Sequence, residues 1–127
     1  MDAIRKKKIE AEIIRTLGSL FVSGKVKDPG ISLVSIHRAE LSQDLVYVKI
    51  WVTTYCEDRE KGKFLSALKR ASGFCQHILA QELKLRNTPR IQFIWDENYI
   101  KSVKLNELID RLPKATIEED EIKNDSK

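Results

Sequence analysis

Apolar residues recur every three or four positions in three parts of the chain, and this spacing predicts amphipathic helices. The first helix is expected over residues 3–23, before a stop at Gly24. The second is expected over residues 58–86 and the third over residues 99–112. The face that the first helix buries should consist of Ile9, Ile13, Leu17 and Leu20.

Alternating apolar and polar residues predict three strands, over residues 31–41, 45–54 and 90–95. The alternation in the first strand slips by one position, which predicts a bulge near His37-Arg38. Just before this strand, Asp28-Pro29-Gly30 is typical of a type II turn, in which the glycine has a positive φ. The buried face of the second strand should consist of Val46, Val48, Ile50 and Val52.

The second predicted helix contains a break and counts as two, so the order is helix, strand, strand, helix, helix, strand and helix. A three-stranded sheet must bury one face, and helices are the cover that this chain offers. We therefore predict an α+β fold in which helices cover one face of the sheet. Residues 1–112 form the predicted domain, and the polar, charged residues 113–127 are expected to be a disordered tail.

The second predicted helix contains a signal for a break at Ala71-Ser72-Gly73. Glycine inside a helix costs about 1 kcal/mol relative to alanine, so Gly73 predicts a kink or an interruption. Ser72 is expected to cap a second helix, whose first N–H groups would be free to bind phosphate. We also expect Asp58 to cap the first part and the second part to end at a left-handed Asn87.

Positive charge is concentrated around this predicted break. The chain carries a net charge of +4, and the segment from Arg59 to Arg90 has eight basic and two acidic residues. This distribution favours a polyanionic partner, while a solvated helical surface remains the alternative. The residues proposed to bind RNA are Lys61, Lys63, Lys69, Arg70, Ser72, Gly73, Gln76, Lys84, Arg86 and Arg90.

Residues that usually carry catalysis or bind metals are sparse. His37 and His77 stand in no metal-ligand spacing, and Cys56 and Cys75 form no pairing motif. The sequence contains no phosphate-binding loop, nucleophile elbow or dinucleotide-binding glycine motif. We expect no enzymatic activity, metal, cofactor or small-molecule substrate, and a buried Cys75. No apolar run approaches the roughly 20 residues that cross a bilayer, so a cytoplasmic protein without membrane contact is expected.

Two aromatic residues, Tyr47 and Trp51, lie on the polar face of the second predicted strand. On an open sheet face such rings could stack the bases of RNA. They could equally support the last helix or a partner protein, and a protein–protein adaptor that uses this face is the alternative function.

Four short motifs of the chain belong together. They are Ser42-Gln43-Asp44-Leu45, Lys69-Arg70-Ala71-Ser72-Gly73-Phe74, Leu83-Lys84-Leu85-Arg86-Asn87-Thr88-Pro89 and Leu105-Asn106-Glu107-Leu108-Ile109. In combination they resemble the bacterial ribosome-binding factor A family. The resemblance covers residues 3–112 in the order of the family. Gly30 departs from it, because members of the family often have arginine there.

The resemblance implies a type II KH-like fold, in which an interrupted helix at Ala71-Ser72-Gly73 replaces the glycine-rich loop of ordinary KH domains. It also implies a monomer that binds the free 30S ribosomal subunit and 16S ribosomal RNA. Members of the family assist late 30S maturation and 5′-end processing of 16S RNA without catalysis, and they are associated with growth in the cold.

Overall fold

The computed structural model describes residues 3–31 and 33–111. The chain divides after Asp96 into two compact units, of which the first contains the sheet and the second contains the last helix. The predicted boundary at residue 112 and the tail over residues 113–127 lie outside the described residues. The elements are α1 (Ala3–Val22), β1 (Ser35–Leu41), β2 (Tyr47–Thr53), the 3-10 helix η1 (Asp58–Glu60), α2 (Lys61–Leu83), β3 (Arg90–Trp95) and α3 (Glu97–Asp110).

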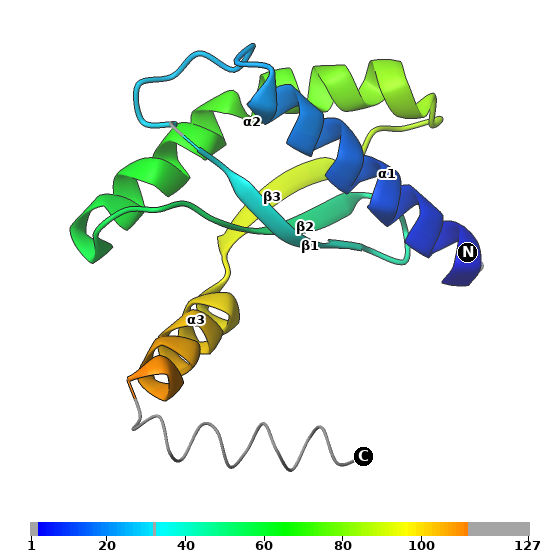
Figure 1. The fold of residues 1–127 in the computed structure, drawn as a ribbon. Helices are drawn as coiled ribbons and strands as arrows, with labels where there is room; N and C mark the ends of the chain where they lie inside the picture. The colour runs from blue at the N-terminus through cyan, green and yellow to red at the C-terminus, as the bar shows by residue number, and fades with distance from the viewer. Residues whose placement is uncertain (1–2, 32, 112–127) are drawn as a thin grey trace, which may run out of the picture. The chain divides into compact units, whose positions relative to one another are not determined.

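The three strands form one sheet in the order β1-β2-β3, so β1 and β3 are its edges. β1 and β2 are antiparallel, whereas β2 and β3 run parallel. Figure 1 shows α1 and α2 on the same side of this sheet. The α+β fold with helices on one sheet face is therefore confirmed.

The hydrophobic core lies between this sheet and the two helices. All four residues predicted for the buried face of α1 are buried. β2 contributes Val48, Ile50 and Val52, which are fully buried, whereas Val46 is 44% exposed. The prediction for Val46 was wrong because the strand begins at Tyr47, after a turn in which Leu45 has a φ of 64°.

The structure around β1 agrees in part with the sequence predictions. The ladder between β1 and β2 shifts between Ile36 and Arg38, which confirms the bulge. β1 begins at Ser35, four residues later than predicted. Gly24 ends α1 with a left-handed φ of 75°, as expected of a stop residue.

Gly30 does not adopt the positive φ of a type II turn, so that prediction was wrong. The turn is closed by the Ile31 N–H, which donates to the carbonyl of Asp28 at 2.9 Å, and the Gly30 N–H donates to Asp28 Oδ1 at 2.9 Å. Glycine is required here for space instead. A Cβ added at Gly30 would lie 2.8 Å from the Cβ of Ala67 in α2.

Both predicted ends of α2 needed correction. Asp58 begins a short 3-10 helix, and Glu60 precedes α2 without a side-chain cap. The helix ends at Leu83 because Lys84 takes the left-handed conformation, with a φ of 52°, that had been expected of Asn87. α3 begins at Glu97, two residues earlier than predicted.

Candidate nucleic-acid interface

α2 is one continuous α-helix through Ala71-Ser72-Gly73, although Figure 1 shows that it changes direction near its middle. Ser72 does not cap a second helix. Its Oγ donates to the carbonyl of Lys69 at 2.6 Å, a contact that often accompanies bends in helices. The predicted phosphate site on free N–H groups was therefore wrong, because the helix does not start anew at this point.

Gly73 is not needed for close packing at the bend. It is exposed, its φ is not positive, and a Cβ added there would meet no atom within 4 Å. The bend thus accompanies the Ser72 contact instead of a helix break at glycine.

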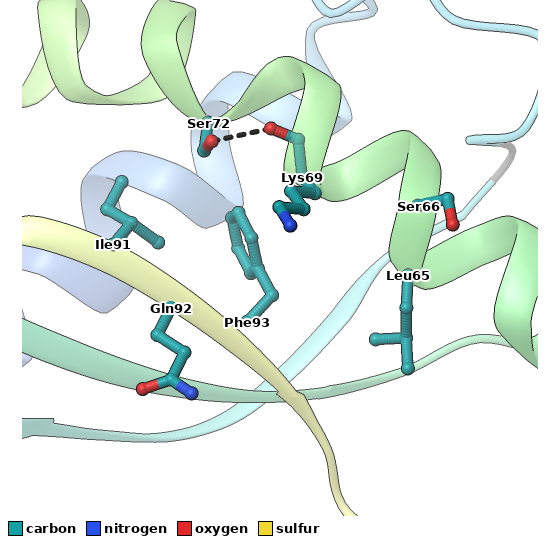
Figure 2. Close-up of a pocket in the computed structure, with 7 residues that line it drawn as sticks. All are labelled: Leu65, Ser66, Lys69, Ser72, Ile91, Gln92 and Phe93. Carbon is teal, nitrogen blue, oxygen red and sulfur yellow. Dashed lines mark hydrogen bonds between the residues drawn. The ribbon is translucent and has the colours of Figure 1, made fainter.

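The bend region of α2 borders a cleft of about 450 Å³ beside the edge strand β3. Figure 2 shows Lys69 pointing from the helix into the space above the strand, and Phe93 pointing from the strand toward the helix. Ser66 and Ser72 add hydroxyl groups to this cleft, and Gln92 also lines it. Its apolar lining consists of Leu65, Ile91 and Phe93.

Gln76, proposed as an RNA contact, fastens β3 to α2. Its Oε1 accepts from the Ile91 N–H at 3.3 Å, on the edge of β3 that does not pair with β2. Because backbone groups alternate along a strand, the N–H and C=O of Phe93 point to the same edge. The cleft therefore combines one lysine, an apolar lining and strand-edge backbone groups.

Arg70, the neighbour of Lys69, is engaged on the other side of α2. Its Nε and Nη2 donate to the two carboxylate oxygens of Asp28, each at 3.0 Å. This bidentate pair lowers the pKa of Asp28, which the Gly30 N–H lowers further, and raises the pKa of Arg70. The charge of Arg70 is therefore already balanced by a carboxylate of this chain.

The other proposed contacts lie along the margins of α2. Lys61 Nζ lies 5.3 Å from the ring centroid of Trp95, and Lys63 lines a second cleft, of about 430 Å³, beside Pro29. Lys84 and Arg86 are exposed in the segment that leads into β3, and Arg90, the first residue of β3, is exposed as well. The structure therefore brings Lys69 and Ser72 together in one cleft, and the other proposed basic residues are not among those that line it.

Sequence reasoning missed five of the residues that line the cleft: Leu65, Ser66, Ile91, Gln92 and Phe93. A signal for part of this set was present. Ser66, Lys69 and Ser72 recur every three residues, and this spacing places them along one side of a helix. The count of charged residues did not reveal this stripe, because the two serines carry no charge.

Among residues 3–31 and 33–111, no group of three or more His, Cys, Asp or Glu side chains could hold a metal ion. Cys75 is buried, as predicted, and burial raises the pKa of its thiol to about 11. No helix in the described part of the chain is long and apolar enough to span a membrane.

Comparison with known proteins identifies the family. The family model for ribosome-binding factor A matches residues 5–109. A ribosome-binding factor A of Leptospira biflexa is 42% identical over 120 residues, which cover 94% of this chain and 80% of that protein.

Two solved structures are also similar. The crystal structure of ribosome-binding factor A from Thermus thermophilus is 28% identical with a TM-score of 0.60, covering 71% of this chain and 94% of that one. A homology model of the Thermus thermophilus factor, fitted into an electron cryo-microscopy map of its complex with the 30S subunit, is 26% identical with a TM-score of 0.57. That match covers 68% of this chain and 90% of the other. With the KH-like fold and the family match over most of its length, the chain belongs to the ribosome-binding factor A family.

Proposed function

We propose that this protein binds the free 30S ribosomal subunit through 16S RNA, with the cleft between α2 and β3 as the central contact. The observation that carries the proposal is Lys69, which enters a half-apolar cleft bordered by strand-edge backbone groups. The segment from Arg59 to Arg90, to which Lys69 belongs, carries eight basic and two acidic residues. Family membership supports the same partner, since a similar structure was fitted into a 30S complex.

Within the cleft, each kind of group has a role that suits RNA. The ammonium of Lys69 pairs with a backbone phosphate, which positions the strand without reading sequence. The apolar side chains Leu65 and Phe93 contact the face of a nucleotide, while the N–H and C=O of Phe93 reach the hydrogen-bonding edge of its base. The Ser72 hydroxyl donates a hydrogen bond to the carbonyl of Lys69. This bond helps to fix the bend from which that lysine projects.

The proposed action is positional and involves no catalysis. Binding holds a segment of 16S RNA in an immature arrangement late in 30S assembly, and so assists maturation and processing of its 5′ end until the factor leaves. Such a role needs a surface that recognises RNA and no reactive group. The buried, high-pKa Cys75 agrees with it.

Co-sedimentation with free 30S subunits tests the proposal. The full chain should travel with the subunits at low salt, and its affinity should fall with a log–log slope of about −0.7 to −0.9 for each phosphate neutralised. Lys69→Glu should weaken the complex strongly, whereas Lys104→Glu, the same charge change on an exposed lysine of α3, should not. A protein that stays at the top of the gradient at low salt would refute the proposal.

A further inference from the structure

The face of the sheet opposite α1 and α2 carries exposed aromatic and basic side chains. The ladders place Arg38 opposite Trp51, Tyr47 opposite Arg90, and Lys49 opposite Gln92. Side chains alternate along a strand, so these residues turn away from the buried Val48, Ile50 and Val52. We call this surface the outer face; its main residues are Arg38, Tyr47, Lys49, Trp51, Arg90 and Gln92.

Two positions on the outer face present flat groups. The Tyr47 side chain is 51% exposed. Trp51 is half-buried, and the Arg38 guanidinium carbon lies 3.8 Å from the centroid of its ring. Arg38 itself is exposed, so the pair offers a guanidinium plane backed by an indole. RNA bases stack both on tyrosine rings and on arginine planes.

The charges between these positions suit an RNA backbone. Lys49 lies between Tyr47 and Trp51 on the same strand and is exposed, as is Arg90 opposite Tyr47. Four residues along a strand span about 13 Å, which an extended strand of two to three nucleotides bridges. Three outward-facing side chains of these described strands are basic, namely Arg38, Lys49 and Arg90. One is a carboxylate, Glu40, which the ladder places opposite Lys49.

The outer face is continuous with the cleft described above. Gln92 lines that cleft, yet in Figure 2 its side chain points to the opposite side of β3 from Phe93. Its ladder partner is Lys49, at the centre of the outer face. A chain of nucleotides that leaves the cleft over the edge of β3 therefore arrives at Lys49.

We propose that the outer face is a second RNA-binding surface, specific for unpaired RNA. One base stacks on Tyr47 and another on the Arg38–Trp51 pair, while Lys49 and Arg90 contact phosphates. This inference rests on the proposed function and extends it, because the bases of a duplex are already stacked on each other and cannot occupy these positions. The proposed ligand is therefore a single-stranded segment of RNA that runs from the cleft onto the outer face of the sheet.

The test compares a labelled single-stranded RNA of about 12 nucleotides with the same RNA annealed to its complement. Tyr47→Leu in the full chain should lower affinity for the single strand about tenfold and leave duplex binding unchanged, since stacking on a ring is lost. Tyr47→Phe keeps the ring and should bind within about twofold of the original. Tyr55→Leu is the matched control, because Tyr55 is 98% exposed and lies outside β2.

A second readout follows the other stacking position. Trp95→Phe leaves Trp51 as the remaining tryptophan of the two in the chain. Single-stranded RNA should then quench the fluorescence of Trp51, and Arg38→Ala should change the extent of this quenching.

Three results would overturn the inference. The first is no single-strand binding, or binding that Tyr47→Leu leaves unchanged. The second is loss of 30S binding on Tyr47→Leu with naked RNA still bound, which would mean that the outer face docks a protein. The third is an equal loss of affinity for single-stranded and for duplex RNA in Tyr47→Leu. If Lys69→Glu abolishes 30S binding while Tyr47→Leu changes nothing, the inference fails and the proposed function stands.

Discussion

Lys69 and Arg70 are adjacent in sequence and carry the same charge, but they lie in different surroundings. Lys69 enters the cleft between α2 and β3, whereas Arg70 is paired with both carboxylate oxygens of Asp28. Successive residues on a helix are about 100° apart, so neighbours in sequence face different surroundings. A run of positive charge therefore contains both binding residues and residues that stabilise the fold.

The two sides of α2 also differ in their contacts with the rest of the chain. On the Arg70 side, the loop before β1 approaches so closely that Gly30 has no room for a side chain, and Asp28 of this loop pairs with Arg70, although a cleft of about 430 Å³ lies beside them. On the Lys69 side, a cleft of about 450 Å³ lies between the helix and the sheet edge. We infer that the Arg70 side holds the structure together and that the Lys69 side is available to a ligand. The following experiments test that division, beginning with the largest expected effect.

Gly30→Val should be the most destabilising change on the Arg70 side. A Cβ there lies 2.8 Å from that of Ala67, and overpacking of this kind costs about 1–3 kcal/mol. The free energy of unfolding from urea titrations should fall by this amount. Ala67→Gly combined with Gly30→Val removes the clashing methyl group and should recover part of the loss relative to Ala67→Gly alone. Unchanged stability of Gly30→Val would mean that the loop moves freely and does not hold the helix.

Lys69→Gln and Arg70→Gln, which each remove one charge, should separate binding from folding. Lys69→Gln should lower 30S affinity roughly five- to tenfold at about 0.1 M salt and reduce the salt slope by about one, because one phosphate contact is lost. Arg70→Gln should lower the urea midpoint and change affinity much less. If both variants lose affinity equally, Arg70 exchanges Asp28 for phosphate on binding, and the division between the two sides fails.

The sequence predicted the fold because the patterns that determine it are local. The spacing of Ile9, Ile13 and Leu17 and the alternation of Val48 and Ile50 identify the core faces without reference to any distant contact. The bulge near Arg38 could likewise be found, since a slip in alternation has one structural meaning. Errors at element ends, such as Lys84 in place of Asn87, arose where several residues could adopt the same left-handed conformation.

The candidate interface was harder to predict because it depends on contacts between distant residues. Nothing near Arg70 in sequence indicates Asp28, which lies 42 positions away. Gln76 was proposed as an RNA contact, and only the approach of β3 shows that its Oε1 accepts from the Ile91 N–H. Ser72 is a good cap in isolation, but the helix continues, so its hydroxyl turns back to Lys69.

Gly73→Ala tests whether the bend needs a glycine. Because Gly73 has open space around it and a φ that is not positive, alanine should raise the free energy of unfolding by about 1 kcal/mol. Affinity for 30S subunits should stay within about twofold, since Lys69 and the Ser72 contact are untouched. A stabilised protein that no longer binds would show that flexibility at Gly73, and not the shape of the cleft, is required on the Lys69 side.

The smallest effect is expected from the titration of Asp28. The Arg70 guanidinium, and then the Gly30 N–H, hold its pKa below the ordinary value, so the ionised form is favoured in the folded chain. Stability from this group is therefore present above the pKa of the unfolded state, about 3.9, and is lost as pH falls through the lower folded value.

Asp28→Asn should accordingly be less stable than the original protein at pH 7, and the difference should shrink below about pH 4. Urea titrations from pH 3 to pH 7 measure it, with Arg70→Gln as the partner variant that should show the same convergence. A difference that stays the same from pH 7 to pH 3 would indicate that the charge of the Asp28 carboxylate does not stabilise the fold. The stabilising role of the Arg70 side would then rest on packing at Gly30 and not on the ion pair.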